Sequence, residues 1–153
     1  MKKLIFLLLI LVSFNLQAEE FKLSCNIRLV TYYSVDGSSE THQYNEVFEI
    51  TDYGKSKYIM PSSVNFRSVS TSNRSKNHPN TLSIDDFSDL SKWDITVNTK
   101  SKIEGKVDVT SIRIDRNVGK IWYSADFNTP SGNTILETGV GDCEKVDVSK
   151  KKF

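Results

Sequence analysis

The chain has 153 residues, of which 38% are hydrophobic and 25% are charged, so it is long enough to bury a core and fits one domain. Its 20 basic and 19 acidic residues give a net charge of +1. This balance excludes the basic excess that nucleic-acid-binding proteins use to neutralise phosphates, and we expect no nucleic acid partner.

The first residues follow the order of a secretory signal peptide. Two lysines precede an apolar run over residues 4–12, and Ala18 supplies a small residue before two glutamates. The run is too short for a membrane-spanning helix, which needs about 20 residues. We therefore predict a signal peptide over residues 1–18, a periplasmic or secreted protein, and one domain over residues 19–153 without a transmembrane span. An uncleaved N-terminal anchor is the alternative.

The two cysteines, Cys25 and Cys143, lie near opposite ends of the predicted domain. An even pair in an exported protein predicts a disulfide bond, which would join the first strand to the last. Closing so long a loop would stabilise the fold by about 4–5 kcal/mol in the chain-entropy picture. Two free buried thiols or a metal pair are the alternatives, although no histidine or further cysteine stands beside either residue.

The first half of the domain has the alternating pattern of strands. Polar and apolar residues alternate over 21–33, a turn follows at 36–39, and the alternation returns over 44–50, which predicts a hairpin. Residues 57–60 and 64–69 predict two further short strands on either side of a proline.

A polar segment then covers residues 70–80, and we predict a long surface loop there. Ser83 followed by two aspartates is typical of the start of a helix, because carboxylates stabilise the first turn. With Phe87 and Leu90 three residues apart, a single short helix is predicted over residues 85–91.

Strands return in the second half. Alternation predicts strands over 93–98, 107–114, 121–127 and 135–143, with a change of phase near Thr110 that predicts a β-bulge. The whole pattern predicts a mostly β fold: an antiparallel sandwich or barrel of about eight strands with at most one short helix. A parallel sheet is disfavoured because no long helical pattern separates the strands.

The segment from Ile112 to Val146 carries two short motifs, Ile-Asp-Arg-x-x-Gly at residues 114–119 and Gly-x-Cys at residues 141–143. It resembles the C-terminal part of many small exported proteobacterial proteins, largely of unknown function, which end in such a hairpin and strand. A threonine is common in them where Val118 stands, so the turn departs from their usual form. The resemblance implies a bacterial, periplasmic setting and carries no catalytic residue across.

The residues themselves predict local roles in this segment. Gly119 is suited to a turn that needs a positive φ, and Asp115 is placed to accept hydrogen bonds from the turn amides. Gly139 and Gly141 lack the strand–loop–helix setting of a phosphate site and favour close packing of the last strand.

No pattern identifies a catalytic, metal or cofactor site. The two histidines, His42 and His78, are not accompanied by a nucleophile motif. The acidic cluster around residues 85–94 lacks the spacing and glycine of a calcium loop. We therefore predict no catalytic residue, no metal and no cofactor.

A candidate interaction surface is drawn from two groups of residues. Tyr32 and Trp122 fall on the outer face of their predicted strands, and exposed aromatic side chains bind partners or carbohydrates. Arg74, Lys76 and His78 stand in the polar segment. Cross-strand pairing of the aromatic residues, or cover by the polar segment, is the structural alternative.

Three functions remain open at this level. The first is a non-enzymatic binding or interaction module for an envelope protein or polymer. The second is a small β-barrel carrier of an apolar ligand, whose cavity would be lined by two inward rows, Phe21, Leu23, Ile27 and Leu29 in one and Ile121, Tyr123 and Phe127 in the other. The third is an envelope hydrolase with two carboxylates that face each other in a cleft.

Overall fold

The computed structural model describes residues 19–146, so the predicted signal peptide over residues 1–18 lies outside the described residues. Nine strands and one short helix make up this part of the chain. They are β1 (Glu19–Tyr33), β2 (Ser39–Asp52), β3 (Lys57–Pro61), β4 (Val69–Ser70), α2 (Asn73–Lys76), β5 (Thr81–Asp86), β6 (Lys92–Lys100), β7 (Val107–Asp115), β8 (Lys120–Asn128) and β9 (Thr134–Val146). No helix among these residues is both long and apolar enough to cross a membrane.

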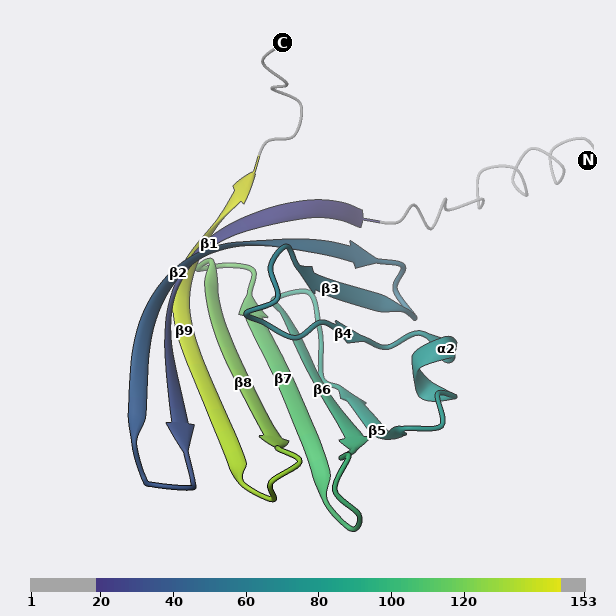
Figure 1. Ribbon diagram of the computed structural model, residues 1–153. Coiled ribbons are helices and arrows are strands. Elements are labelled where there is room, and N and C mark those ends of the chain that lie inside the picture. Colours follow the sequence, from purple (N-terminus) through teal and green to yellow (C-terminus); the bar gives the residue numbers. More distant parts are fainter. Residues whose placement is uncertain (1–18, 147–153) are drawn as a thin grey trace, which may run out of the picture.

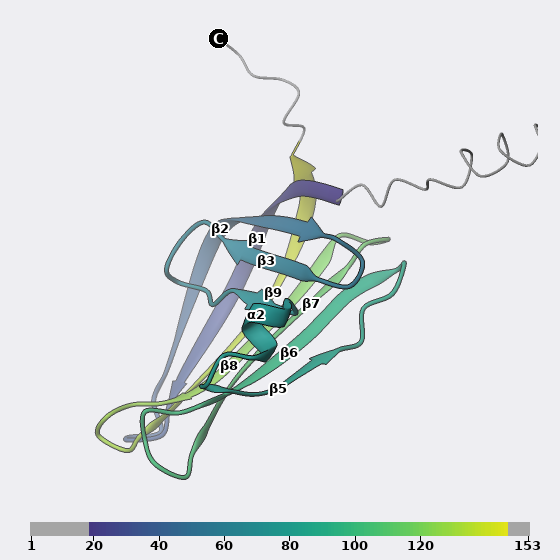
Figure 2. The same cartoon turned by 90° about the vertical axis from the view of Figure 1, so that its right-hand side faces the viewer.

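All nine strands belong to one antiparallel sheet in the order β4-β3-β2-β1-β9-β8-β7-β6-β5. Figure 1 shows that the sheet curls into a half-barrel, and the turned view in Figure 2 places α2 across its open side. The predicted mostly β antiparallel fold is confirmed, with one strand more than expected. The first and last strands pair in the middle of the sheet, and both sheet edges come from the middle of the chain.

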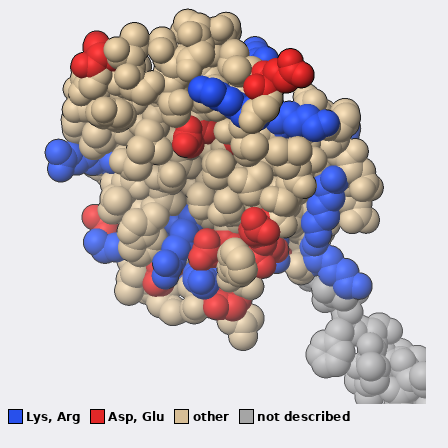
Figure 3. All heavy atoms as spheres, turned by 90° about the horizontal axis from the view of Figure 1, so that it is seen from below, with Lys and Arg blue, Asp and Glu red and all other residues tan. Residues whose placement is uncertain are grey.

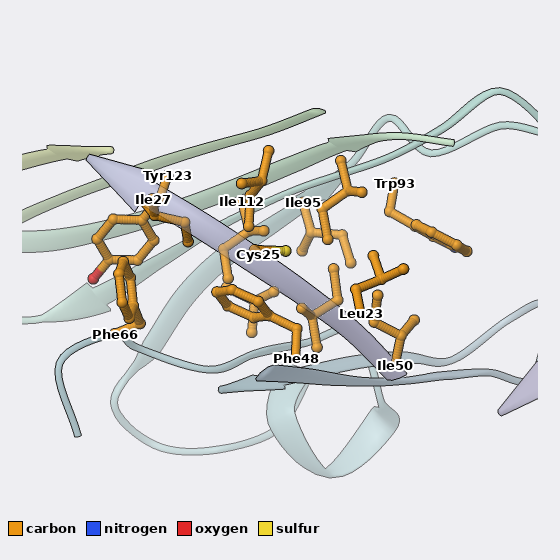
Figure 4. Close-up of a cluster of buried hydrophobic side chains, with 14 of the residues drawn as sticks. Leu23, Cys25, Ile27, Phe48, Ile50, Phe66, Trp93, Ile95, Ile112 and Tyr123 are labelled. Atoms are coloured by element: carbon orange, nitrogen blue, oxygen red, sulfur yellow. The ribbon is translucent and has the colours of Figure 1, made fainter. Parts of the chain in front are cut away.

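The inner face of the curled sheet forms the core. Alternate residues of every long strand point inward, which is the period of two that a half-buried strand requires. Because the sheet curls, side chains of β2 and β3 meet those of β6 and β7 and fill the space between them (Figure 4). The side chains that are completely or almost completely buried include Ile27, Phe48, Ile50, Ile59, Ile95, Ile112, Ile114 and Ile121.

Cys25 and Cys143 stand directly opposite each other in the β1–β9 ladder. Their sulfur atoms are 2.07 Å apart and their Cα atoms 4.0 Å apart, so the pair lies at disulfide distance and joins the first strand to the last. Two glycines of β9 let these strands approach closely: a Cβ on Gly141 would overlap the backbone of β1, and one on Gly139 would press on Ile27.

The β7–β8 turn agrees with its sequence. Gly119 has a φ of 65°, and Asp115 Oδ1 accepts hydrogen bonds from the backbone amides of Asn117 (2.9 Å) and Val118 (3.2 Å). The backbone oxygen of Gly119 in turn accepts a hydrogen bond from the amide of Cys143, so the turn also contacts the last strand.

The predicted helix over residues 85–91 is wrong. Asp85 and Asp86 end strand β5, where Ile84 and Asp85 pair with residues of β6 and complete the hydrogen bonds of that strand. Asp89, which follows β5, accepts a hydrogen bond from the backbone amide of Ser91 in a turn and does not cap a helix. The short helix is α2, inside the segment predicted to be a surface loop, and the Ser72 hydroxyl caps it by accepting from the Ser75 amide.

Two further strand predictions are corrected. The register of β6 and β7 runs without a break from the pair Lys92–Asp115 to the pair Lys100–Val107, so the expected bulge near Thr110 is absent from this ladder. Thr110 points to the inner face of the sheet, where the alternation predicts apolar residues. Val107, although apolar, is 41% exposed. Of the predicted strand over residues 64–69, only its last residue enters a strand, β4.

We expect removal of the Cys25–Cys143 link to lower the free energy of unfolding by about 4 kcal/mol, because the link closes a loop across most of the domain. The Cys25→Ala/Cys143→Ala double variant tests this by urea denaturation. Wild-type protein under reducing conditions should unfold at the same urea concentration as the double variant. Equal stability of the oxidised wild type and the double variant would contradict the prediction.

Candidate binding groove

A groove runs along the open side of the half-barrel, where the two edges of the sheet approach each other. It consists of two hollows of about 620 Å³ and about 250 Å³ that share Ser68 and Val97. One side is formed by the end of β3, the segment that leads to β4, and α2; the other is formed by β6 and β7. Its polar and charged lining residues are Ser63, Arg67, Ser68, Ser70, Arg74, Ser75, His78, Thr81, Thr99 and Thr110.

The first side of the groove begins with a buried carboxylate. Glu46 points to the inner face of β2 and is only 2% exposed. Its Oε1 accepts from the Ser62 amide (2.7 Å), the Ser62 hydroxyl (2.6 Å) and the Ser63 amide (3.0 Å), and its Oε2 accepts from the Ser63 hydroxyl. Glu46 therefore fixes the position at which the chain leaves β3 and starts the groove wall.

These hydrogen bonds decide the charge state of Glu46. Burial by itself would raise the pKa of this carboxyl, but the hydrogen bonds from Ser62 and Ser63 outweigh burial and hold the pKa below its ordinary value. Glu46 is therefore ionised at neutral pH, and its negative charge is stabilised by hydrogen-bond donors in place of a cation.

An aromatic cluster anchors the middle of the same segment. Phe66 is 4% exposed and inserts between the two halves of the sheet. Its ring lies edge-on to Tyr44 (5.7 Å between ring centres), Phe48 (5.8 Å) and Tyr123 (5.0 Å). Aromatic pairs in this geometry add to the stabilisation from burial, so Phe66 holds the groove wall against the core (Figure 4).

Arg67 follows Phe66 and lies over the Phe127 ring, with its guanidinium carbon 4.3 Å from the ring centre. Its backbone amide donates to the Tyr123 hydroxyl (3.3 Å), which itself donates to Glu137 (3.2 Å). Burial raises the pKa of both Tyr123 and Glu137. The stacking places the Arg67 charge at the groove while its apolar face remains covered.

The short helix α2 and the residues just after it supply the remaining basic lining residues. Arg74 and His78 line the smaller hollow together with Ser68, Ser70 and Thr81. The Nδ1 atom of His78 accepts from the Asn80 amide at 3.2 Å, which orients the ring. Lys76 lies in the last turn of the same helix but is not among the lining residues.

The sequence-predicted surface residues divide between two faces. Arg74 and His78 belong to the groove, whereas Tyr32 (45% exposed) and Trp122 (37% exposed) lie on the outer face of the sheet, as their alternation predicts. Trp122 is stacked by Arg113, whose guanidinium carbon is 5.2 Å from the ring centre. The structure therefore does not bring the five residues into one site.

The groove lining is basic and rich in hydroxyl groups. The groove presents two arginines, one histidine and seven hydroxyl side chains, and its lining contains no Asp or Glu among the described residues. Guanidinium groups bind anions through charge-assisted hydrogen bonds, and hydroxyls both donate and accept. Acid–base hydrolysis of a sugar needs two carboxyl groups across a cleft, and the lining does not provide them.

The charges outside the groove are mixed. Figure 3 views the end of the molecule that carries the β1–β2, β6–β7 and β8–β9 hairpins, and it shows acidic and basic side chains interspersed over that end. Elsewhere among the described residues, several charged side chains pair with each other, for example Lys57 with Asp86 (2.8 Å) and Lys92 with Asp94 (2.9 Å). The absence of carboxylates from the groove lining is therefore a local feature.

Asp89 of the acidic cluster accepts hydrogen bonds within its own turn. Asp89 Oδ1 accepts from the Ser91 amide at 2.7 Å and the Ser91 hydroxyl at 2.6 Å. Within residues 19–146, no group of three or more His, Cys, Asp and Glu residues is placed to hold a metal ion.

Sequence analysis did not identify Glu46, Phe66 or Arg67. Glu46 does carry a signal, because it is an acidic residue in the apolar phase of its strand. Such a position predicts a buried carboxylate that needs donors, and two serines follow the next strand. Phe66 and Arg67 carry no local signal, since their roles depend on how the sheet curls.

Comparisons with protein-family models, curated proteins and solved structures give no match to this chain. Its function is therefore inferred from its own residues and their geometry.

We expect Glu46→Gln to lower the free energy of unfolding by about 2 kcal/mol at pH 7, because the amide group cannot accept all the hydrogen bonds of the carboxylate. Since the pKa of Glu46 is lowered in the folded state, its ionised form stabilises the fold above the unfolded-state pKa. The difference between wild type and variant should shrink as the pH falls through the folded pKa.

Urea denaturation at pH 7 and at pH 3 measures this difference. Glu49→Gln is the matched control, because Glu49 lies on the same strand but is exposed and pairs with Lys22 on the surface. We expect it to change stability by no more than about 0.5 kcal/mol. Similar losses for both variants would refute the structural role of Glu46.

Proposed function

We propose that the chain is an exported, non-enzymatic binding module that acts in the periplasm or outside the cell and binds an anionic envelope polymer in its groove. One observation carries the proposal: the lining combines Arg67, Arg74 and His78 with seven hydroxyl side chains and, among the described residues, no carboxylate. A polymer that bears both hydroxyl and acidic groups would bind to both kinds of side chain.

The shape of the groove agrees with an extended ligand. Its two hollows share Ser68 and Val97 and together follow the seam between the sheet edges. Its wall is held by Glu46 at one end and Phe66 in the middle, so little ordering would be needed when a ligand binds. Preorganisation of this kind favours affinity because it reduces the entropy lost on binding.

The two other functions have less support. The rows that a carrier would use to line a cavity, from Phe21 to Leu29 on β1 and from Ile121 on β8, pack against one another in the core (Figure 4). A hydrolase would need two carboxylates in the groove, and the lining has none among the described residues. Glu137, which is hydrogen-bonded to Tyr123, is not one of the lining residues.

Export is supported by two features. The Cys25 and Cys143 sulfur atoms lie at disulfide distance, and disulfides persist mainly in oxidising compartments such as the periplasm. The sequence of residues 1–18 has the order of a signal peptide.

We expect the Arg67→Gln/Arg74→Gln double variant to bind an anionic polysaccharide at least about tenfold more weakly, because two charge-assisted contacts are lost. Isothermal titration with alginate, a soluble polyuronate, measures this, and dextran serves as the neutral probe. Wild-type binding should weaken as salt is added and should be much weaker for dextran.

The Arg28→Gln/Arg113→Gln double variant is the matched control, since it removes the same charge from the outer face. It should bind alginate nearly as wild type does. Equal weakening by both double variants would mean that binding follows overall charge, and it would refute a groove site. No binding of alginate or of purified peptidoglycan to wild type would refute an anionic polymer as the ligand.

We expect the protein isolated from the compartment into which it is exported to begin at Glu19 and to lack the hydrogens lost on forming one disulfide. Intact-protein mass spectrometry before and after reduction measures both. Cell fractionation of the same culture supplies the control. A retained N-terminus in the cytoplasmic fraction, with two free thiols, would contradict export.

A further inference from the structure

A second cavity lies at the opposite end of the half-barrel, where β1 begins and the β7–β8 turn closes the sheet. Its volume is about 230 Å³, and it shares no lining residue with the groove. We call it the rim pocket. Its lining residues are Glu19, Phe21, Leu23, Trp93, Ile114, Asp115, Arg116, Gly119, Cys143 and Lys145.

The floor of the rim pocket is apolar. Phe21 and Trp93 pack together with 4.8 Å between ring centres and a tilt of 35° between the rings, and both are almost buried, at 8% and 3% exposed. The indole nitrogen of Trp93 donates to Asp52 at 3.1 Å, so the ring is fixed. Leu23 and Ile114 complete a surface that suits a short hydrocarbon body.

Two cations border this floor. The Arg116 guanidinium carbon lies 4.3 Å from the Trp93 ring centre, and the Lys145 ammonium lies 5.3 Å from the Phe21 ring centre. Aromatic faces hold cations in place without neutralising them. Among residues 19–146, Lys145 forms no ion pair.

The pocket also holds two carboxylates, and each has a defined role. Asp115 accepts from the amides of the β7–β8 turn. Glu19 accepts from the Arg116 guanidinium at 3.0 Å and 3.2 Å, yet its side chain is 48% exposed. An exposed ion pair of this kind is weak, so an incoming carboxylate could replace that of Glu19 on Arg116.

We propose that the rim pocket binds a small amphiphilic carboxylate, with the acid group between Arg116 and Lys145 and the apolar body on Phe21 and Trp93. Glu19 occupies the acid position when no ligand is bound. The site is independent of the groove. Because the pocket is smaller than the 300–1,000 Å³ typical of drug-sized ligands, the body must be short.

The experiment uses Trp93 as the reporter. The chain has two tryptophans, and Trp122→Phe leaves Trp93 as the single fluorophore. Titrating this protein with octanoate should change the Trp93 emission saturably. Octanol, which has the same body without the charge, should bind at least about tenfold more weakly, since charge-assisted hydrogen bonds are lost.

Variants of the Arg116–Glu19 pair should act in opposite directions. Arg116→Gln should weaken octanoate binding about tenfold, whereas Glu19→Gln should strengthen it about threefold because the competing carboxylate is removed. Arg113→Gln, which removes a stacked arginine from the outer face, should change nothing. An unchanged urea midpoint for each variant confirms that it is folded, and Arg116→Lys, which keeps the charge, should recover part of the binding.

Equal affinity for octanol and octanoate would overturn the proposal, since the pocket would then recognise only an apolar body. Weaker binding by the Glu19→Gln variant would also overturn it, because Glu19 would then be a contact and not a competitor. Loss of binding in the Arg113→Gln control would overturn it as well, because binding would then follow overall charge and not the rim pocket.

Discussion

The pairing of the first strand with the last, in the middle of the sheet, is the constraint on which the rest of the structure depends. It is made by the long β1–β9 ladder, by the Cys25–Cys143 link within that ladder, and by two glycines that let the backbones approach. With the terminal strands in the middle, the edges of the sheet must come from β4 and β5. Those edges are close in sequence, since only residues 71–80 separate them.

This closeness explains why the sheet curls. An extended connection of that length could span roughly 30 Å, but α2 shortens it, and β4 makes contacts with β6 and β7. The two edges therefore face each other across a narrow seam instead of lying at opposite ends of an open sheet (Figure 2). The groove follows that seam, and its lining is formed by the side chains of the segments on either side.

The same arrangement keeps the edges short. β4 has two residues, and β5 has six with a shift in register between Thr81 and Ser83. Short and irregular edge strands offer a poor template for pairing with another chain. Hydroxyl side chains of β4 and of the segments beside it are then free to line a groove while the protein avoids edge-to-edge association.

Much of the fold could be predicted from local pattern because most strands lie with one face on the core. Alternation located β1, β2 and the strands from β6 to β9, and the inward phase of Phe21 to Leu29 is the phase observed. Prediction failed where the pattern is set by tertiary neighbours. Strand β5 carries serine and aspartates typical of a helix start, and it is a strand because β6 presents an open edge beside it.

The groove could not be predicted for a related reason. Arg67 and Thr110 are distant in the chain, and only the curl of the sheet brings them to one hollow. The pairing of Cys25 with Cys143, in contrast, was predictable because two cysteines allow only one intramolecular pair. Local chemistry was predictable in the same way at Asp115 and Gly119, where the turn needs both residues irrespective of the rest of the fold.

The interior is divided between an apolar end and a polar side, and this division bears on how the two proposed sites would behave. Around Phe21 and Trp93 the core is aromatic and aliphatic up to the rim pocket. Beside the groove, buried polar groups are joined instead by hydrogen bonds, which the serines that follow β3 donate to Glu46 and Tyr123 donates to Glu137. Buried polar networks fix one geometry, because each displaced group would lose its partner.

A ligand in the groove would therefore meet a wall whose backbone is set before it arrives. Its binding would need rearrangement of exposed side chains, such as Arg74, but no repacking of the core. A ligand in the rim pocket would have to displace the Glu19 carboxylate, and so its affinity would depend on an ion pair within the protein. The two sites thus differ in what opposes binding: the ordering of surface side chains in the groove, and competition from Glu19 at the rim.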